Sequence, residues 1–327
     1  MNDKIRCAIV GLGRIGSSLE DDKLREKPAS HAGAVAENVN CILVGGADIN
    51  EEARIAFSER WKINDVFETT EDMIIQTKPQ LFHIATHPDS HLEYVKLGIK
   101  YEIPVIICEK PLAPSLKEAK KIVKLIEKSE TKLVLNHERR YSRDYVYVKE
   151  QIKKKVYGRL ISLHARLYMG KNSTPQKSLY HDGTHMIDII RYLTEGNWSR
   201  VKVFGNVKKK GQNLIIVSKL GQADVVFEIG GQRDAIVFEL DLSFERGRIR
   251  IGNGLYEEYE SKMSPYYEKM RSLIQRKDIE FKRTEYFKGM LEDAVSLILK
   301  KKQEPLSKAI DGYEVIKTIE KIIRKSN

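Results

Sequence analysis

The residues with the clearest chemical purpose follow an apolar segment near the start of the chain. Residues 4–10 predict a buried strand, and Gly11-Leu12-Gly13-Arg14-Ile15-Gly16 comes directly after it. In a strand–G-x-G-x-x-G–helix unit the first glycine makes the tight turn, the second brings the backbone close to a pyrophosphate, and the third packs the helix on the sheet. The helix N-terminus directs its free N–H groups at the anion. This order predicts a dinucleotide site, against the alternative of a glycine-rich turn without a ligand.

A carboxylate follows the second predicted strand, residues 41–47. In a dinucleotide fold an acid at this place binds the ribose hydroxyls, and Asp48 would repel a 2′-phosphate, so we expect NAD rather than NADP. Asp48 lies 32 residues after Gly16, against a usual spacing of about 20. The excess predicts a loop over residues 20–31, with the helix resuming near His31. The alternative is that Asp48 only caps the helix predicted over 51–61.

A Glu-Lys-Pro triplet, Glu109-Lys110-Pro111, follows a strand predicted over residues 105–108. The carboxyl ends of parallel strands form the crevice where ligands bind, and Pro111 restricts Lys110 to an extended backbone. A lysine fixed there could act as an acid or a base. Taken alone, such a triplet is more often a solvated turn.

A second chemical candidate is the segment Tyr180-His181-Asp182-Gly183-Thr184-His185, followed by Asp188. His185 and Asp188 are three apart at a predicted helix, so they share a face, and a carboxylate can hold the tautomer of a histidine that moves protons. The alternatives are a histidine satisfied in the core, a helix cap at Asp182, and a metal site of His181, His185 and Asp188. Hydride transfer needs no metal, so we expect none.

A third polar group, Thr86-His87-Pro88 with His91, follows the strand predicted over residues 81–85. At that carboxyl end it could line the ribose on the nicotinamide side. A turn with a helix cap at Ser90 fits the same residues equally well.

These residues must be positioned by two domains, since 327 residues exceed one ordinary core. Up to about residue 137, strands alternate with helices, which predicts a doubly wound parallel α/β sheet. From residue 138 onward, consecutive strands predict an α+β domain with an open, mainly antiparallel sheet, and we expect the last helix to pack back on the first domain. The predicted strands of the second domain are 160–168, 201–207, 213–220, 223–229, 235–243 and 248–252, and its helices are 180–193, 287–302 and 308–325.

Composition narrows the function classes. The net charge is +11, but the lysines are dispersed in short runs without interleaved aromatics, which favours solvated faces over nucleic-acid binding. No apolar run is long enough to span a membrane. The chain enters a strand within a few residues, which leaves no room for a signal peptide and predicts a cytoplasmic protein. Cys7, Cys41 and Cys108 lie among apolar residues and predict buried thiols rather than a disulfide or metal site.

Together these motifs resemble the Gfo/Idh/MocA (glucose–fructose oxidoreductase / inositol dehydrogenase) family, nearly end to end. The resemblance implies a Rossmann domain joined to an open-sheet domain, and NAD(P)-dependent hydride transfer at a secondary alcohol or ketone of a sugar, cyclitol or nucleotide sugar. It implies that Lys110 contacts substrate and nicotinamide, that His185 shuttles the hydroxyl proton, and that Glu109 lies near the nicotinamide ribose. An open sheet face favours self-association, so we expect a homo-oligomer, a dimer or tetramer. The residues that carry the resemblance are Gly11–Gly16, Thr86–Pro88 with His91, Glu109–Ala113, Asn136 with Arg139–Tyr141, Gly183–His185 with Asp188, Gly247–Ile249 and Glu304–Leu306.

Two departures from the family pattern stand out. The family often has Asp four residues before the catalytic histidine, where this chain has His181, so the part of Asp182 as a substrate ligand is in question. The extra residues 20–31 could form part of the substrate wall. We name Arg139, Tyr168 and Tyr180 as further candidate sugar contacts. Two other classes remain: a reductase of a non-sugar substrate such as a tetrapyrrole or imine, and an NAD-binding sensor without turnover.

Overall fold

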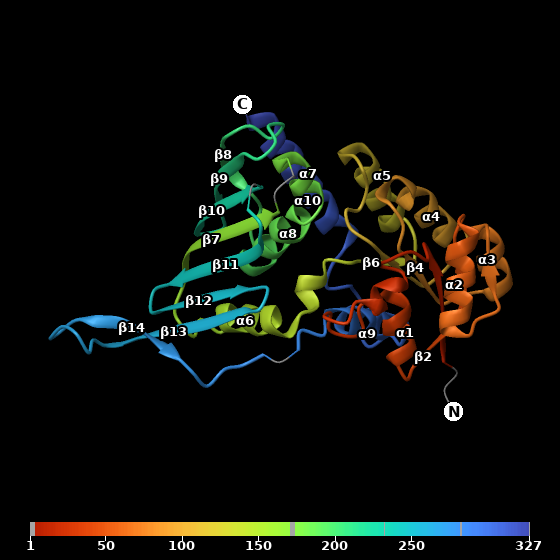
Figure 1. Ribbon diagram of the computed structural model, residues 1–327, viewed down its shortest axis with the longest axis horizontal. Helices are drawn as coiled ribbons and strands as arrows, with labels where there is room; N and C mark the ends of the chain where they lie inside the picture. Colours follow the sequence, from red (N-terminus) through yellow and green to blue (C-terminus); the bar gives the residue numbers. More distant parts are fainter. Residues whose placement is uncertain (1–3, 171–173, 232, 282, 327) are drawn as a thin grey trace. The chain divides into compact units, whose positions relative to one another are not determined.

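The chain folds into two compact units in the computed structural model, which describes residues 4–170, 174–231, 233–281 and 283–326. Within that described part, one unit comprises 4–141 and 285–313, and the other comprises 142–170, 174–231, 233–281, 283–284 and 314–326 (Figure 1). The chain therefore leaves the first unit after β6 and returns to it near the C-terminus.

The first unit is built on a six-stranded parallel sheet with strand order β3-β2-β1-β4-β5-β6. Its strands read as nearly continuous apolar runs, as expected for strands covered on both faces, and Cys7, Ile9 and Leu81 are fully buried. The order reverses between β1 and β4, which is the switch point where such sheets bind ligands. The predicted doubly wound sheet is confirmed. Its strands are β1 Ile5–Val10, β2 Cys41–Ala47, β3 Val66–Phe67, β4 Leu81–Ile84, β5 Val105–Cys108 and β6 Lys132–Leu135.

Helices cover this sheet, and α1 packs against α9 over a core shared with β1 and β2. The Ser115 hydroxyl accepts a hydrogen bond from the backbone N–H of Glu118 and so caps α5. The cap expected at Ser90 is wrong: α4 begins at Pro88, because proline is well suited to the first helical position. The helices are α1 His31–Glu37, α2 Glu51–Trp61, α3 Thr70–Thr77, α4 Pro88–Lys100, α5 Leu116–Glu127 and α9 Tyr286–Ile298, with short 3-10 turns η1 Ser18–Asp21 and η2 Glu138–Tyr141.

The helix that follows the glycine turn is interrupted and then resumed. The backbone N–H of Ser17 bonds to Gly13 O at 2.9 Å, which closes one turn, and the chain then leaves the helix. It returns at α1, where His31 N bonds to Ile15 O and Ala32 N to Gly16 O, each at 3.0 Å. His31 therefore takes the place that the fourth residue after Ile15 has in an ordinary helix. Without the twelve inserted residues, Asp48 would follow Gly16 by about 20, the usual spacing.

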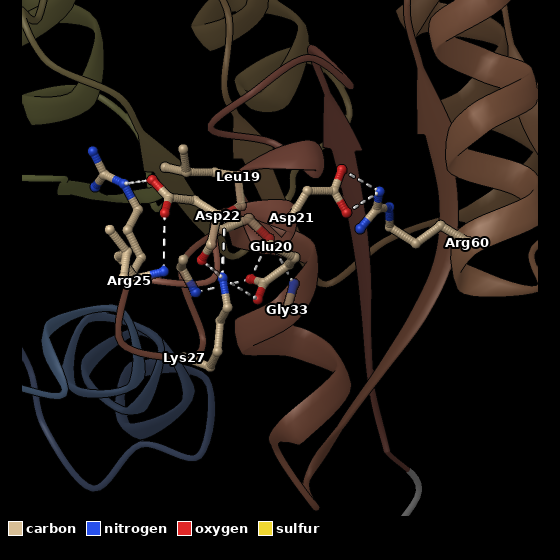
Figure 2. Close-up of polar contacts among 11 residues, drawn as sticks. Leu19, Glu20, Asp21, Asp22, Arg25, Lys27, Gly33 and Arg60 are labelled. Carbon is tan, nitrogen blue, oxygen red and sulfur yellow. Dashed lines mark hydrogen bonds and ion pairs between the residues drawn. The ribbon is translucent and has the colours of Figure 1, made fainter.

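The inserted segment is held by its own polar contacts (Figure 2). Lys27 Nζ donates to the carbonyl oxygens of Leu19 and Asp22, at 3.3 and 2.8 Å, and Arg60 Nη2 bonds to both carboxylate oxygens of Asp21, at 2.8 and 2.6 Å. Glu20 Oε1 accepts from Ala29 N and from the Ser30 hydroxyl, each at 2.8 Å. Ser30 in turn caps α1 by accepting from Gly33 N. The loop predicted before His31 is thus an ordered segment that delivers the chain to the helix N-terminus.

The second unit is an eight-stranded sheet with order β14-β13-β12-β11-β7-β10-β9-β8, in which the β7–β10 pair is parallel and the other pairs are antiparallel. The mainly antiparallel sheet is confirmed, whereas the β13–β14 hairpin was not predicted. Val315, Ile319 and Ile322 of α10 belong to the core of this unit. The strands are β7 Leu160–Met169, β8 Ser199–Phe204, β9 Asn213–Leu220, β10 Ala223–Gly230, β11 Ile236–Phe244, β12 Gly247–Gly252, β13 Leu255–Met263 and β14 Arg271–Arg276.

The single helix predicted over residues 180–193 is wrong at its start. The structure has α7 Pro175–Tyr180 and α8 Gly183–Thr194, with His181 and Asp182 between them. His181 has a ψ of −92°, which is incompatible with a continuous helix. The remaining helices of this unit are α6 Arg143–Lys153 and, from residue 314 onward, α10 Ala309–Lys325.

A chain lacking residues 19–30 should still fold. Deletion would make the bond from His31 N to Ile15 O an ordinary i→i−4 helix bond, so we expect α1 to form directly after the glycine turn. Each lost kcal/mol of stability would lower the melting temperature by about 2–4 °C for a domain of this size. Circular dichroism and thermal melting check this, and a chain that is insoluble or lacks cooperative melting would contradict it.

Candidate functional site

The glycine turn has the geometry that a bound pyrophosphate needs. Gly11 has a φ of +87°, and a Cβ there would lie 2.5 Å from Ala85 O. A Cβ on Gly16 would lie 2.0 Å from Gly11 O, so this position also excludes a side chain. A Cβ on Gly13 would meet no atom within 4 Å. Two glycines are therefore required by the protein's own backbone, while the middle one faces open space that a ligand can approach closely.

Asp48 connects the end of β2 to that turn. Its Oδ2 accepts from the backbone N–H of Leu12 at 2.8 Å, and its Oδ1 accepts from Asn50 N at 2.9 Å. The N-cap of α2 is Asn50, whose side chain accepts from Ala53 N. The alternative that Asp48 merely caps this helix is thus wrong. Its carboxylate lies beside the glycine turn, where the residue that binds the ribose is expected.

Glu109 lies at the end of β5 and is the centre of a buried polar chain. Its Oε1 contacts His31 Nε2 at 3.0 Å and accepts a hydrogen bond from the Asn136 amide. Its Oε2 accepts from the backbone N–H of Lys110 at 3.3 Å. Burial raises the pKa of this carboxyl, but the hydrogen bonds and charges of His31, Lys110 and Asn136 outweigh burial and hold it below its usual range. Glu109 is therefore an ionised acceptor fixed at the carboxyl edge of the sheet.

The chain of contacts continues inward from His31. His31 Nδ1 lies 3.0 Å from Nδ1 of His83, a residue of β4, and both rings are fully buried. Burial, followed by the charge of His31, holds the pKa of His83 well below its usual range. Sequence reasoning missed His31 as a partner of Glu109 and His83 as a partner of His31. The only signal was a single polar residue, His83, within an otherwise apolar strand.

Thr86, His87, Pro88 and His91 follow β4 at the same edge. His91 is buried, and its ring nitrogens lie 3.1 Å from Thr86 O and 3.2 Å from Leu112 O. The Thr86 hydroxyl bonds to the Ser90 hydroxyl at 2.7 Å. His91 thereby joins the segment after β4 to the segment after β5, which carries Lys110. This contact is structural, and it supports the edge rather than presenting a free side chain to a ligand.

The second unit places its own candidates around α8. His185 and Asp188 are both buried, on the first two turns of this helix. Asp182 occupies the N-cap position without capping through its side chain, and its Oδ2 instead lies 2.6 Å from His181 Nδ1. The alternative of a helix cap at Asp182 therefore holds for its position but not for its side chain, which makes no capping hydrogen bond. Tyr180 ends α7, where burial and then the charge of Glu320 raise its pKa.

Tyr168 and Arg139, the other candidate sugar contacts, are already engaged. The guanidinium of Arg233 lies 3.7 Å from the centre of the Tyr168 ring. Burial and a hydrogen bond to Glu228 raise the pKa of Tyr168. Arg139, on η2 of the first unit, lies 3.7 Å from the Glu138 carboxylate. The contacts of Lys110 and His185 with a substrate, and their convergence on one ring, stay predictions.

The geometry now permits a comparison with known proteins. Residues 5–137, which include the glycine turn, Asp48 and the Glu109–Lys110 segment, match the GFO_IDH_MocA family model, described as an oxidoreductase family with an NAD-binding Rossmann fold. Over those residues the chain is similar to this family. The match confirms the predicted NAD-binding Rossmann domain over residues 5–137.

Relatives of this chain include the inositol 2-dehydrogenase of Salmonella paratyphi B, which is 25% identical over 206 residues. That match covers 61% of this chain and 57% of the relative, so the chain spans just over half the length of the curated relatives it matches. A putative NADPH-dependent oxidoreductase from Desulfitobacterium hafniense has a TM-score of 0.83 at 16% identity, covering 100% of this chain and 96% of the other. A levoglucosan dehydrogenase, solved with NADH and levoglucosan, has a TM-score of 0.79 at 16% identity, covering 99% and 97%. These structures share the fold.

The cysteines, metal-ligand groupings and apolar helices of the described residues are simpler features of the structure. Cys7, Cys41 and Cys108 are free and buried, as predicted. Among the described residues, no three His, Cys, Asp or Glu side chains gather as a metal site would require. No helix in the described part combines the length and apolar character of a membrane span.

Gly13 and Gly16 should respond differently to substitution. We expect Gly13→Ala to keep the melting temperature of the wild type and to weaken NADH binding about tenfold or more, because its Cβ enters only the space open to the ligand. Gly16→Ala should lower the melting temperature, since its Cβ would clash with Gly11 O. Thermal melting and NADH fluorescence titration measure both effects, and equal loss of stability in the two variants would contradict the assignment.

Proposed function

We propose that this protein is an NAD-dependent oxidoreductase that acts on a secondary alcohol or ketone of a sugar, cyclitol or nucleotide sugar. The observation that carries the proposal is the arrangement at the carboxyl edge of the first sheet. An open glycine turn, a carboxylate at the end of β2 and an ionised Glu109 beside Lys110 are the parts that a nicotinamide dinucleotide requires. The names of the relatives, inositol 2-dehydrogenase among them, support a polyol substrate.

The residues of the turn and edge would bind the cofactor. Gly11, Gly13, Arg14, Ile15 and Gly16 would hold the pyrophosphate and Asp48 the adenosine ribose. Thr86, His87, Pro88 and Glu109 would surround the nicotinamide half, on an edge that His91 holds in place. When bound, the nicotinamide ring accepts or donates the hydride. A carboxylate at Asp48 repels a 2′-phosphate, which is why NAD is preferred over NADP.

The protein's own groups would then move the proton and hold the substrate. In the oxidation direction, Lys110 or His185 in its neutral form would take the hydroxyl proton while the carbinol hydrogen leaves as hydride. The other of the two, when protonated, would stabilise the developing alkoxide charge. Arg139, Tyr168, Tyr180, Asp182 and Asp188 would bind the substrate's hydroxyl groups. A fixed, buried Glu109 would keep the Lys110 backbone in place, and such pre-organisation lowers the barrier to reaction. A cytoplasmic location and self-association as a dimer or tetramer belong to the same proposal.

Lys110→Ala should separate chemistry from cofactor binding. We expect kcat to fall by about 100-fold or more, the usual contribution of a positioned acid or base, while the affinity for NADH stays within a few fold of the wild type. Screening cyclitols, sugars and nucleotide sugars by the absorbance of NADH identifies the substrate for this assay. Near-normal turnover in Lys110→Ala would contradict the catalytic role. Tight NADH binding with no turnover of any such substrate by the wild type would instead favour a sensor or a non-sugar reductase.

Asp48 should set the choice between NAD and NADP. Ile49 is 86% exposed beside it, so Asp48→Ser combined with Ile49→Arg removes the repulsive carboxylate and adds a cation near the 2′-phosphate position. We expect the ratio of NAD to NADP affinity to shift by about tenfold or more toward NADP. Ile49→Arg alone is the matched control, because it keeps the carboxylate. Unchanged selectivity in the double variant would contradict the assignment of Asp48.

A further inference from the structure

The buried polar chain behind Glu109 is more elaborate than cofactor binding alone requires. Its members come from four separate places in the first unit: His83 from β4, His31 from the first turn of α1, Glu109 from the end of β5 and Asn136 from the end of β6. Their exposed fractions are 0%, 0%, 6% and 2%. Burying this many polar side chains costs free energy unless each finds a hydrogen-bond partner. Packing alone therefore does not explain why these four polar side chains lie in the interior.

The proton positions in this chain follow from hydrogen-bond bookkeeping. An ionised Glu109 can only accept, so His31 Nε2 and the Asn136 amide are the donors to its Oε1. The Nδ1 atoms of His31 and His83 face each other, and only one of them can carry a proton. Two lone pairs would repel each other, and so would two N–H groups. His83 Nε2 has no hydrogen-bond partner among the described residues, so His83 completes the chain only through His31. His31 is therefore the one residue that connects the interior of the sheet to Glu109.

The start of α1 determines where His31 lies. Ser30 caps α1, and the backbone N–H of His31 donates to Ile15 O. The backbone that carries the His31 ring is therefore fixed to the helical turn that follows Gly13. Its ring also packs edge-on against Phe287 of α9, with centroids 5.5 Å apart. The cap at Ser30, the bond to Ile15 O and the Phe287 ring therefore hold His31 in place, with its Nε2 3.0 Å from Glu109 Oε1.

We propose that His31 is a positioning residue, which holds the Glu109 carboxylate ionised and oriented toward the nicotinamide-side ribose of the dinucleotide. This inference rests on the proposed function, because it concerns the same cofactor. Besides His31, the titratable or charged groups around Glu109 are Lys110 beside it, Cys108 before it and His91 on α4, each of which interacts with its charge. Among these, His31 alone donates a side-chain hydrogen bond to Glu109.

The test is the pH dependence of NADH affinity, followed by NADH fluorescence from pH 5 to pH 9 in the wild type and in His31→Phe. In the wild type the pKa of Glu109 is low, so its carboxylate stays charged and we expect a flat profile. In His31→Phe, burial remains while the main donor is lost, so the pKa of Glu109 rises and the carboxylate is protonated as the pH falls. We expect NADH affinity to match the wild type at pH 9 and to be about tenfold weaker at pH 5.5.

Three further variants separate positioning from folding. His31→Gln keeps an amide donor and should restore the flat profile. His137→Phe is the matched control, since His137 is another buried histidine of this unit, bound to the Ser307 hydroxyl at 3.0 Å, and its loss should add no pH dependence. Glu109→Gln in the His31→Phe background should remove the pH dependence. A flat profile in His31→Phe, with wild-type binding intact, would overturn this inference, whereas absence of NADH binding by the wild type would overturn the proposed function instead.

Discussion

The hydrogen bond from His31 N to Ile15 O is the contact on which the rest of the first unit depends. This bond joins the helical turn that closes at Ser17 to α1. The glycine turn is therefore still followed by a helix, although the inserted segment separates the two parts in sequence. The same bond fixes the backbone of His31, whose ring reaches Glu109 at the end of β5. One backbone bond thus couples the segment that would bind a pyrophosphate to the carboxylate beside Lys110.

Charge at this edge is arranged so that each carboxylate has donors. Asp48 accepts from two backbone N–H groups, and Glu109 accepts from His31, Asn136 and the Lys110 backbone. Buried or half-buried acids are costly without such partners, and here the partners also fix the carboxylate orientations. The geometry is therefore pre-formed in the protein, and a dinucleotide would meet acceptors already in place.

The sequence predicted the parts with strong local signals. The apolar strands β1, β2, β4 and β5 and the turn at Gly11 each carry a pattern within a few residues. The loop before His31 was predicted from an excess of spacing alone. The way in which α1 continues the earlier helical turn could not be predicted. It depends on backbone hydrogen bonds to Ile15 O and Gly16 O from residues sixteen positions later in the chain.

Other features were missed for the same reason, since they depend on tertiary contacts. The break at His181–Asp182 has no glycine or proline at the break itself, and the short β3 and the β13–β14 hairpin lack an apolar periodicity that separates them from loops. The partnership of His31, His83 and Asn136 with Glu109 joins four distant segments. Sequence reasoning identified Glu109 and Lys110 by their place after a strand, but not the groups that hold them.

The measurement that tests the central claim most directly is isothermal titration calorimetry of the unmodified protein with NAD⁺ and, separately, NADP⁺. The account predicts one NAD⁺ bound per chain, with NAD⁺ bound more tightly than NADP⁺. Tighter binding of NADP⁺ than of NAD⁺, or no saturable binding of either nucleotide, would contradict it.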